Sequence, residues 1–203
     1  FNIIFSYFLF NFFFDLNKIL NSLMHNKFFK KYYFINKFNK NHLEKLDNRV
    51  HIIYRNYKNP INLKLLINLR NFCKKRGIKL YLSNNFKLAL KLRLDGVYLP
   101  SFNKNTRYNC FKFKKNFDII GSAHNVAELN TKKRQRVKSI FIAPVFKKKR
   151  FKLGIYGFLR LKNFTSKNLI VLGGVTKEKM NMISFLNAEG FAAINYFQKK
   201  RPL

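Results

Sequence analysis

Two glycines follow directly after an apolar run in the stretch VLGGVT, where Gly173 and Gly174 precede Thr176. Glycine has no Cβ atom, so a phosphate group can approach its backbone N–H closely. A helix that begins near Thr176 would add the positive end of its dipole to the same place. The pair therefore fits two interpretations, a phosphate-binding turn or an ordinary tight turn.

A second stretch whose residues could take part in catalysis or binding is FDIIGSAHN, in which Ser122 and His124 end an apolar run. An imidazole at a strand-to-helix junction can act as an acid or a base near neutral pH. The structural alternative is that His124 caps or hydrogen-bonds the next helix. No general base with an orienting acid is identifiable beside Ser122, so we expect it to contact a phosphate and not to act as a nucleophile.

The elements that must position these residues are eight apolar runs rich in Ile, Val, Phe and Tyr. They cover residues 32–35, 49–54, 78–82, 95–99, 117–123, 139–146, 169–174 and 190–197. Most are continuous and do not alternate with polar residues, which is typical of parallel strands buried on both faces. Helical patterns lie between several of them, so the sequence predicts a (β/α)₈ barrel, with an open doubly wound sheet as the alternative. In a barrel, the glycine pair would end strand seven, where this fold usually binds phosphate.

Helix-start signals support this element order. Asn59 and Pro60 predict an N-cap and first helical residue after the second strand. Asn125 with Glu128 predicts a capping box after the fifth strand. Thr176 predicts the cap of the helix that follows the seventh strand.

The charge of the chain allows two explanations. Lys and Arg number 42 against 8 Asp and Glu, which gives a formal net charge of +34. Such a balance suggests nucleic acid or an anionic surface as a partner. An AT-rich coding sequence is the explanation that we favour, because Phe, Lys, Asn and Ile dominate together. The basic residues are spread along nearly the whole chain, so we expect no specific nucleic-acid partner.

Residues 1–30 differ from the rest of the chain and form an apolar N-terminal extension. Its first fourteen residues are shorter than the roughly 20 that a spanning helix needs, and they lack the basic start and cleavage site of a secretory signal. We expect no membrane span, and interpret the extension as a helix covering the barrel or as translated upstream sequence outside the domain. The barrel domain is predicted over residues 31–203.

Cys73 and Cys110 show neither metal spacing nor a disulfide framework, which favours a reducing compartment, the cytoplasm. The oligomeric state stays open.

Seven stretches, in this order and spacing, resemble the thiamine phosphate synthase/TenI family of (β/α)₈ barrels. They are YRNYK, LYLSNNFKLAL, DGVYLP, IIGSAHN, APVF with LGIYGF, VLGGVT and AEGFAAINYF. The resemblance implies a transferase of thiamine biosynthesis. Members of the family join hydroxymethylpyrimidine diphosphate to thiazole phosphate, which gives thiamine phosphate and pyrophosphate. A TenI branch isomerises the thiazole precursor instead.

The resemblance carries over well for the thiazole-phosphate half of the site. It implies phosphate contacts from Gly173 and Gly174, and places Ile194 and Asn195 where the family has Ile-Ser after the last strand. The asparagine can still donate a hydrogen bond. The Ser-Ala-His of strand five is present with Ser122 and His124. Together with Arg55, at the family's arginine after strand two, these two form the implied catalytic set.

The diphosphate half departs from the family. Its two magnesium-binding aspartates align with Asn84 and Asn103, and its lysine falls on Tyr57, with Lys58 just beyond. The loop after APVF is shortened to KKKRFK, which leaves Lys152 as a candidate substrate contact. Mg²⁺ prefers carboxylate oxygens, so the resemblance implies this cofactor while the two asparagines should weaken its hold considerably. Arg55 and the basic loop could neutralise the diphosphate directly.

Three classes of function therefore stay open. The first is an enzyme that makes thiamine phosphate from small-molecule phosphates. The second is a TenI-like thiazole tautomerase or a non-catalytic binder of thiazole phosphate, favoured by the loss of the carboxylates. The third is a basic nucleic-acid-binding protein, favoured by the net charge alone.

Overall fold

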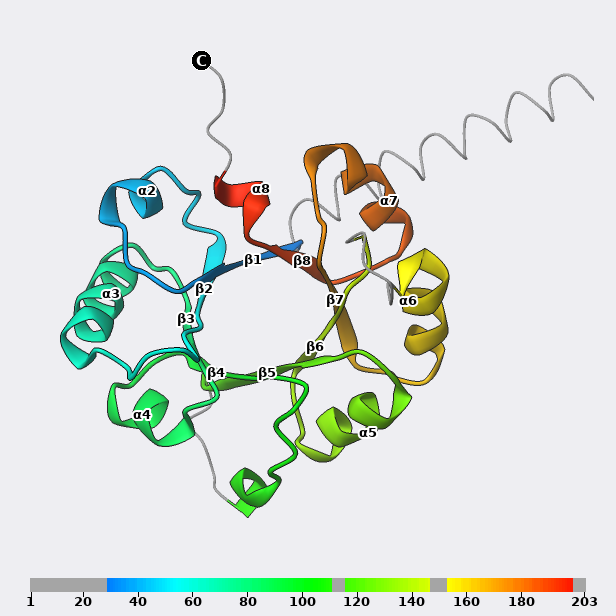
Figure 1. Ribbon diagram of the computed structural model, residues 1–203, viewed down its shortest axis with the longest axis horizontal. Coiled ribbons are helices and arrows are strands. Elements are labelled where there is room, and N and C mark those ends of the chain that lie inside the picture. Colours follow the sequence, from blue (N-terminus) through cyan, green and yellow to red (C-terminus); the bar gives the residue numbers. More distant parts are fainter. Residues whose placement is uncertain (1–28, 111–115, 147–152, 199–203) are drawn as a thin grey trace, which may run out of the picture.

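The computed structural model describes residues 29–110, 116–146 and 153–198 of the chain. Eight parallel strands form a closed barrel in which each strand pairs with the next along the chain and the last pairs with the first (Figure 1). The strands are β1 (Lys30–Ile35), β2 (Val50–Tyr54), β3 (Leu80–Ser83), β4 (Gly96–Leu99), β5 (Asp118–Ala123), β6 (Ser139–Ile142), β7 (Asn168–Leu172) and β8 (Gly190–Ala193). The predicted (β/α)₈ barrel is confirmed, and the alternative of an open sheet is wrong.

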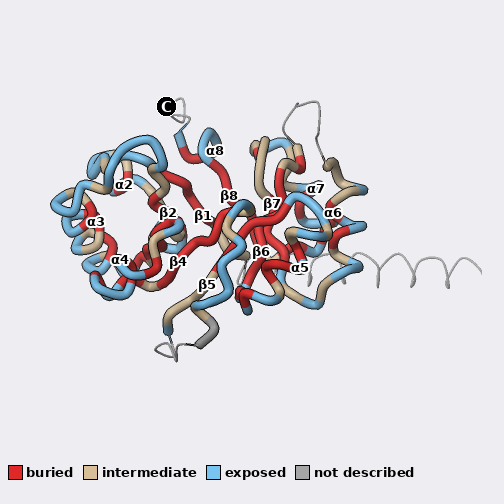
Figure 2. Tube along the Cα trace, turned by 60° about the horizontal axis from the view of Figure 1, so that its bottom comes forward, coloured by how far each residue is buried: buried red, intermediate tan, exposed pale blue. Residues whose placement is uncertain are grey.

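Helical segments lie outside the barrel, between the strands and after β8. They are α2 (Lys40–Glu44), α3 (Leu63–Lys75), α4 (Phe86–Lys91), η1 (Arg107–Cys110), α5 (Val126–Arg134), α6 (Gly154–Asn163), η2 (Lys177–Lys179), α7 (Met180–Phe185) and α8 (Asn195–Gln198). Figure 2 shows the buried strands at the centre and the exposed outer faces of the helices around them. No helix in these described ranges combines the length and apolarity needed to cross a bilayer.

The strands are apolar along their whole length because both of their faces are covered. Residues that point outward pack against the helices, as Leu66 and Leu69 of α3 show with almost no exposure. Large aromatic side chains fill the barrel itself. The rings of Phe34 and Tyr98 are 5.1 Å apart and meet edge to face, and Phe141 lies 5.5 Å from Tyr98. The interior is thus a packed core, which confines any ligand site to the ends of the strands.

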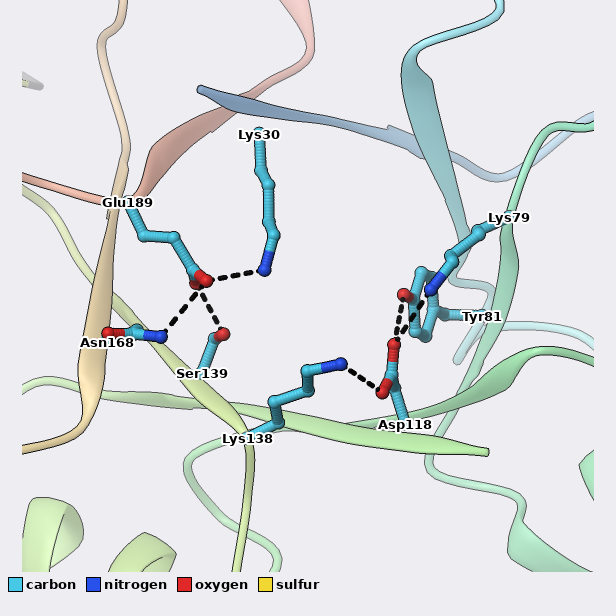
Figure 3. A network of polar contacts seen from close by, with 8 residues as sticks. All are labelled: Lys30, Lys79, Tyr81, Asp118, Lys138, Ser139, Asn168 and Glu189. Atoms are coloured by element: carbon cyan, nitrogen blue, oxygen red, sulfur yellow. Dashed lines mark hydrogen bonds and ion pairs between the residues drawn. The ribbon is translucent and has the colours of Figure 1, made fainter. Parts of the chain in front are cut away.

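Two carboxylates, those of Glu189 and Asp118, organise a polar network at the amino end of the barrel (Figure 3). Lys30, Ser139 and Asn168 contact Glu189, while Lys79, Lys138 and Tyr81 contact Asp118. Burial would raise the pKa of Asp118, but the contacts with the two lysines outweigh it and hold that pKa below its ordinary value. This network closes the end of the barrel opposite to the one where the predicted site residues lie.

Asparagine side chains cap four of the described helices, the first being α2, where Asn39 accepts from His42 N at 3.1 Å. The Oδ1 atom of Asn62 accepts from Leu65 N at 3.0 Å. The Oδ1 atoms of Asn85 and Asn125 likewise accept from the backbone N–H three residues further along the chain. The prediction that α3 begins at Asn59 and Pro60 is wrong, because Asn62 is the cap that the chain uses.

The predicted capping box at Asn125 is half correct. Its side chain accepts from Glu128 N at 2.9 Å, but the Glu128 carboxylate reaches one residue further back and accepts from His124 N at 2.7 Å. The predicted cap at Thr176 is also half correct. Thr176 occupies the N-cap position of η2, which leads directly into α7 at Met180, but its side chain makes no capping hydrogen bond.

Three strands end earlier than predicted, and of these β7 stops at Leu172, before the glycine pair. β6 stops at Ile142, and Pro144 beyond it has no N–H to continue the ladder. β8 stops at Ala193, because the carbonyl of Ile194 accepts from Phe197 N in a helical turn. At the other end of the chain β1 begins at Lys30, one residue inside the predicted extension. The remainder of that extension, residues 1–28, lies outside the described residues.

Candidate functional site

The predicted site residues gather at the carboxyl ends of the strands. In a closed parallel barrel these ends face one side, so residues that follow different strands lie around one mouth. Within the described residues this set comprises Arg55 and Lys58 after β2, Asn84 after β3, Asn103 after β4, Ser122 and His124 at the end of β5, Gly173 and Gly174 after β7, and Ile194 and Asn195 after β8. Lys152 lies outside the described residues.

The glycine pair after β7 has a backbone that only glycine adopts readily. Gly173 has φ +95° and Gly174 has φ +73°. A Cβ atom on Gly173 would lie 3.1 Å from Cα of Pro144, so the turn also packs closely against the segment after β6. Among the described residues, neither glycine N–H donates to a backbone carbonyl. The pair is therefore built as a tight turn and still has donors for a ligand.

The neighbouring loop, after β8, presents exposed side chains. Ile194 is exposed, and the exposed Asn195 begins the short helix α8. β7 and β8 are paired, with Leu172 opposite Ala192, so the loops that follow these two strands are neighbours. The predicted thiazole-phosphate residues thus share one part of the barrel mouth.

Arg55 follows directly after β2, and contacts of both its backbone and its side chain fix its position. Its N–H donates to Ile35 O at 2.8 Å, and its guanidinium carbon lies 4.6 Å from the centre of the Phe34 ring. Stacking on an aromatic ring leaves the edge of a guanidinium available for a bidentate oxyanion. Lys58, by contrast, has an exposed side chain in the turn that follows.

Tyr57, the position to which the resemblance assigns the family's lysine, contacts β3. Its hydroxyl lies 2.6 Å from Oγ of Ser83. Burial raises the pKa of Tyr57 above its ordinary value, while the contacts with Ser83 and Arg55 act in the opposite direction. The side chain is therefore a neutral hydrogen-bonding group at neutral pH and does not supply the positive charge of a lysine.

Ser122 is almost fully buried, with 3% of its surface exposed. It contacts Tyr98 in the barrel interior, where burial raises the pKa of Tyr98 to about 12 and the contact with Ser122 opposes that rise. This contact anchors Ser122 within the core, and a nucleophilic role has no base to support it here. The predicted phosphate contact stays a prediction.

His124 is oriented by the strand next to it. Its Nδ1 lies 2.5 Å from the carbonyl oxygen of Ala143, and because a carbonyl only accepts, Nδ1 carries the hydrogen. In the neutral ring Nε2 then has a free lone pair. The side chain thus bonds to the segment after β6 and not to the next helix, while the backbone N–H of His124 is the group that helix α5 satisfies through Glu128.

Asn84 and Asn103, the aligned positions of the magnesium-binding carboxylates, are in direct contact. Nδ2 of Asn103 donates to Oδ1 of Asn84 at 2.7 Å. Asn84 has φ +57°, a left-handed conformation that asparagine tolerates better than most residues. Within the described ranges, no group of three or more His, Cys, Asp or Glu side chains could hold a metal ion. The two positions are therefore neighbours, and their role as the counterpart of a magnesium site stays a prediction.

Two further residues hold the loop of Asn103 in place, one in α5 and one at the C-terminal end of that helix. Neither of them was singled out from the sequence. Lys132 has no exposed surface, and its Nζ donates to Pro100 O at 2.7 Å and to Asn103 O at 2.9 Å. Burial lowers the pKa of Lys132 to about 8, and the nearby Glu128 opposes that shift. Gln135 donates to the carbonyls of Asn103 and Asn105 at 3.0 and 2.8 Å. No sequence signal distinguishes Lys132 from the other basic residues of KKRQR.

Comparison with known proteins agrees with this architecture. The family model described as thiamine monophosphate synthase matches residues 38–197. The curated protein "Putative thiamine-phosphate synthase 2" of Aquifex aeolicus (strain VF5) is 30% identical over 140 residues, which cover 66% of this chain and 74% of that protein.

Solved structures with the same fold include two thiamine phosphate pyrophosphorylases. The one from Pyrococcus furiosus superposes with a TM-score of 0.65 at 15% identity, covering 85% of this chain and 88% of the other. The one from Bacteroides thetaiotaomicron has a TM-score of 0.58 at 15% identity, with 86% of each chain covered.

Proposed function

This chain belongs to the thiamine monophosphate synthase/TenI family, and from that premise we propose that it joins hydroxymethylpyrimidine diphosphate to thiazole phosphate. A new bond joins the two rings, the bond between the pyrimidine's methylene carbon and the diphosphate oxygen breaks, and pyrophosphate leaves. The observation that carries the proposal is the turn at Gly173 and Gly174, whose N–H groups lie beside the loop of Asn195 at the carboxyl end of β7. The reaction would take place in the cytoplasm.

Each residue at the mouth has a chemical task under this proposal. The N–H groups of Gly173 and Gly174 bind the thiazole phosphate, and Asn195 adds a side-chain donor. Arg55 binds diphosphate oxygens and neutralises the charge that develops as pyrophosphate leaves. Nε2 of His124 accepts a hydrogen bond from a substrate.

The contact between Asn84 and Asn103 favours a second candidate, a TenI-like thiazole tautomerase or a non-catalytic binder of thiazole phosphate. Such a protein needs no diphosphate site, so the carboxylates could be lost without consequence. The glycine turn and His124 serve this candidate equally well. The two candidates differ in whether pyrimidine diphosphate is consumed.

The test uses the full chain with both substrates, with and without MgCl₂, and follows thiamine phosphate formation and pyrophosphate release. A parallel reaction contains the thiazole tautomer precursor alone. Coupling supports the synthase. Isomerisation, or binding of thiazole phosphate without coupling, supports the second candidate and overturns the first.

A variant pair tests the glycine turn. Gly174→Val should abolish thiazole-phosphate binding, because a branched side chain would obstruct the N–H groups and strain the left-handed backbone. Gly77→Val is the matched control, since Gly77 also has positive φ, with no atom within 4 Å of an added Cβ, and lies after α3, away from the mouth. Equal affinity of Gly174→Val and the unmodified protein would mean that the pair is only a turn.

A further inference from the structure

The orientation of the Asn103 side chain is fixed by a backbone donor. Oδ1 of Asn103 accepts from Asn105 N at 2.9 Å, and a backbone N–H can only donate. The NH₂ group of Asn103 must therefore face the other way, toward Asn84. Since that NH₂ group donates, Oδ1 of Asn84 is the acceptor, at 2.7 Å.

A buried ammonium group sets the same orientation from the other side. Nζ of Lys132 donates to Oε1 of Gln135 at 2.8 Å, and an ammonium has no acceptor. Nε2 of Gln135 then faces Asn103 and donates to its Oδ1 at 3.1 Å. The donors in the chain from Lys132 through Gln135 and Asn103 to Asn84 all point in one direction, and bonds in such a chain polarise one another.

The result is that both amide oxygens at the former carboxylate positions are engaged by donors of the protein. The group left over is Nδ2 of Asn84, which has an exposed side chain and finds no acceptor among the described residues. Mg²⁺ is held by oxygen atoms, and an amide N–H turns a positive hydrogen toward it. The residues present therefore do not fit a magnesium ion, and they do fit an oxyanion.

We propose that Asn84 and Asn103 form an anion subsite in which Nδ2–H of Asn84 donates to a diphosphate oxygen with no divalent cation between them. That the anion is a diphosphate rests on the proposed function. Ser83, next to Asn84 in the chain, and Tyr57 add a pair of neutral hydroxyls 2.6 Å apart at the end of the same strand. Arg55 supplies the positive charge, two residues before Tyr57 in the chain.

The experiment is a calorimetric titration of the full chain with inorganic pyrophosphate at about 0.15 M salt, which screens the general attraction of a basic protein. It is run once in EDTA and once in MgCl₂. Asn84→Asp replaces the amide donor with a carboxylate. Asn68→Asp makes the same charge change on the exposed surface of α3 and is the matched control.

We expect the unmodified protein to bind pyrophosphate in EDTA, and MgCl₂ not to tighten binding. Asn84→Asp should bind at least about tenfold more weakly in EDTA, because it loses a donor to a charged group and adds a repelling charge. MgCl₂ should restore part of that loss, since a carboxylate can hold the cation. Mg²⁺ also binds pyrophosphate in solution, and this effect is the same for every protein titrated. Asn68→Asp should therefore match the unmodified protein in both buffers.

Three results would overturn the subsite: a requirement for Mg²⁺ in the unmodified protein, no pyrophosphate binding at all, or an unchanged affinity in Asn84→Asp. Thiazole phosphate, titrated in parallel, separates this failure from failure of the proposed function. If thiazole phosphate binds and pyrophosphate does not, the subsite is wrong while the glycine turn stands. If neither binds, both are wrong.

Gln135 is a positioning residue under this proposal, and Gln135→Met tests it. General damage to the fold would weaken both ligands. Loss of orientation at Asn103 should weaken pyrophosphate and leave thiazole phosphate at the β7 turn unchanged. Equal affinities of Gln135→Met and the unmodified protein for pyrophosphate would contradict the role of Gln135.

Discussion

The ammonium nitrogen of Lys132 lies 2.9 Å from the main-chain carbonyl oxygen of Asn103, so a helix outside the barrel holds the loop that follows β4. The same nitrogen donates to Pro100 O and to Oε1 of Gln135. A lysine ammonium has three donors, and each has an acceptor here. This arrangement compensates for the desolvation of a lysine with no exposed surface.

Replacing this lysine should destabilise the protein. We expect Lys132→Met to lower the free energy of unfolding by about 1–3 kcal/mol, because buried carbonyl groups lose their donor. Urea denaturation measures the change. Lys87→Met, on the exposed face of α4, should stay within about 0.5 kcal/mol of the unmodified protein. Coincident unfolding curves for Lys132→Met and Lys87→Met would show that the loop does not depend on the buried ammonium.

Gly173→Ala should cost more stability than the same change at another left-handed glycine. An added Cβ would lie 3.1 Å from Cα of Pro144, in addition to the strain of φ +95°. We expect a loss of about 1–3 kcal/mol in the free energy of unfolding. Gly77→Ala, with φ +65° and open space around its Cβ, measures the conformational cost alone. An equal loss in both variants would mean that the contact with Pro144 costs nothing.

The barrel could be predicted from the sequence because burial on both faces leaves an unmistakable pattern in parallel strands. Continuous apolar runs such as LIVL and FAA mark β7 and β8, and their order places Gly173 at the mouth. Local signals were less reliable in an asparagine-rich chain. Asn59 and Asn62 look alike as helix caps, and only the fold decides between them.

The roles of the candidate site residues stay predictions, and the orientation of the Asn84 and Asn103 side chains could not be predicted at all. The resemblance placed Asn84 and Asn103 together, but the direction of their hydrogen bond depends on Asn105 and on a lysine 29 residues further on. Lys132 could not be recognised because the chain contains 42 Lys and Arg, and nothing in the local sequence separates it from the others. Burial distinguishes it, and burial is a property of the folded chain.

Arg55→Ala should weaken binding of pyrimidine diphosphate and lower kcat/KM for coupling by about tenfold or more, because a charge-assisted hydrogen bond to phosphate is lost. Arg55→Lys should recover only part of the loss, since an ammonium cannot make the bidentate contact. Arg160→Ala, on the exposed surface of α6, controls for the change in net charge. Unchanged kinetics in Arg55→Ala would rule out its proposed role.

His51 should make the stability of the protein depend on pH. Burial, followed by the nearby Lys79 and Lys30, lowers the pKa of His51 to about 4, and within the described residues its Nδ1 has no hydrogen-bond partner. In the unfolded chain the pKa is about 6.5. Between these two values the unfolded state binds a proton that the folded state does not, so the free energy of unfolding must fall as the pH falls from about 6.5 to 4.

The variant His51→Phe isolates this contribution. Phenylalanine keeps the ring contact with Tyr32, whose centre lies 5.1 Å from the imidazole, and it cannot take up a proton. Urea denaturation at several pH values between 7 and 4 should therefore give a flatter dependence for His51→Phe than for the unmodified protein. The carboxylates of Asp118 and Glu189 are present in both proteins, so their contributions cancel in the comparison. Parallel curves would show that His51 takes up its proton equally well in the folded and unfolded states, and that its burial at the amino end of the barrel does not oppose the charge.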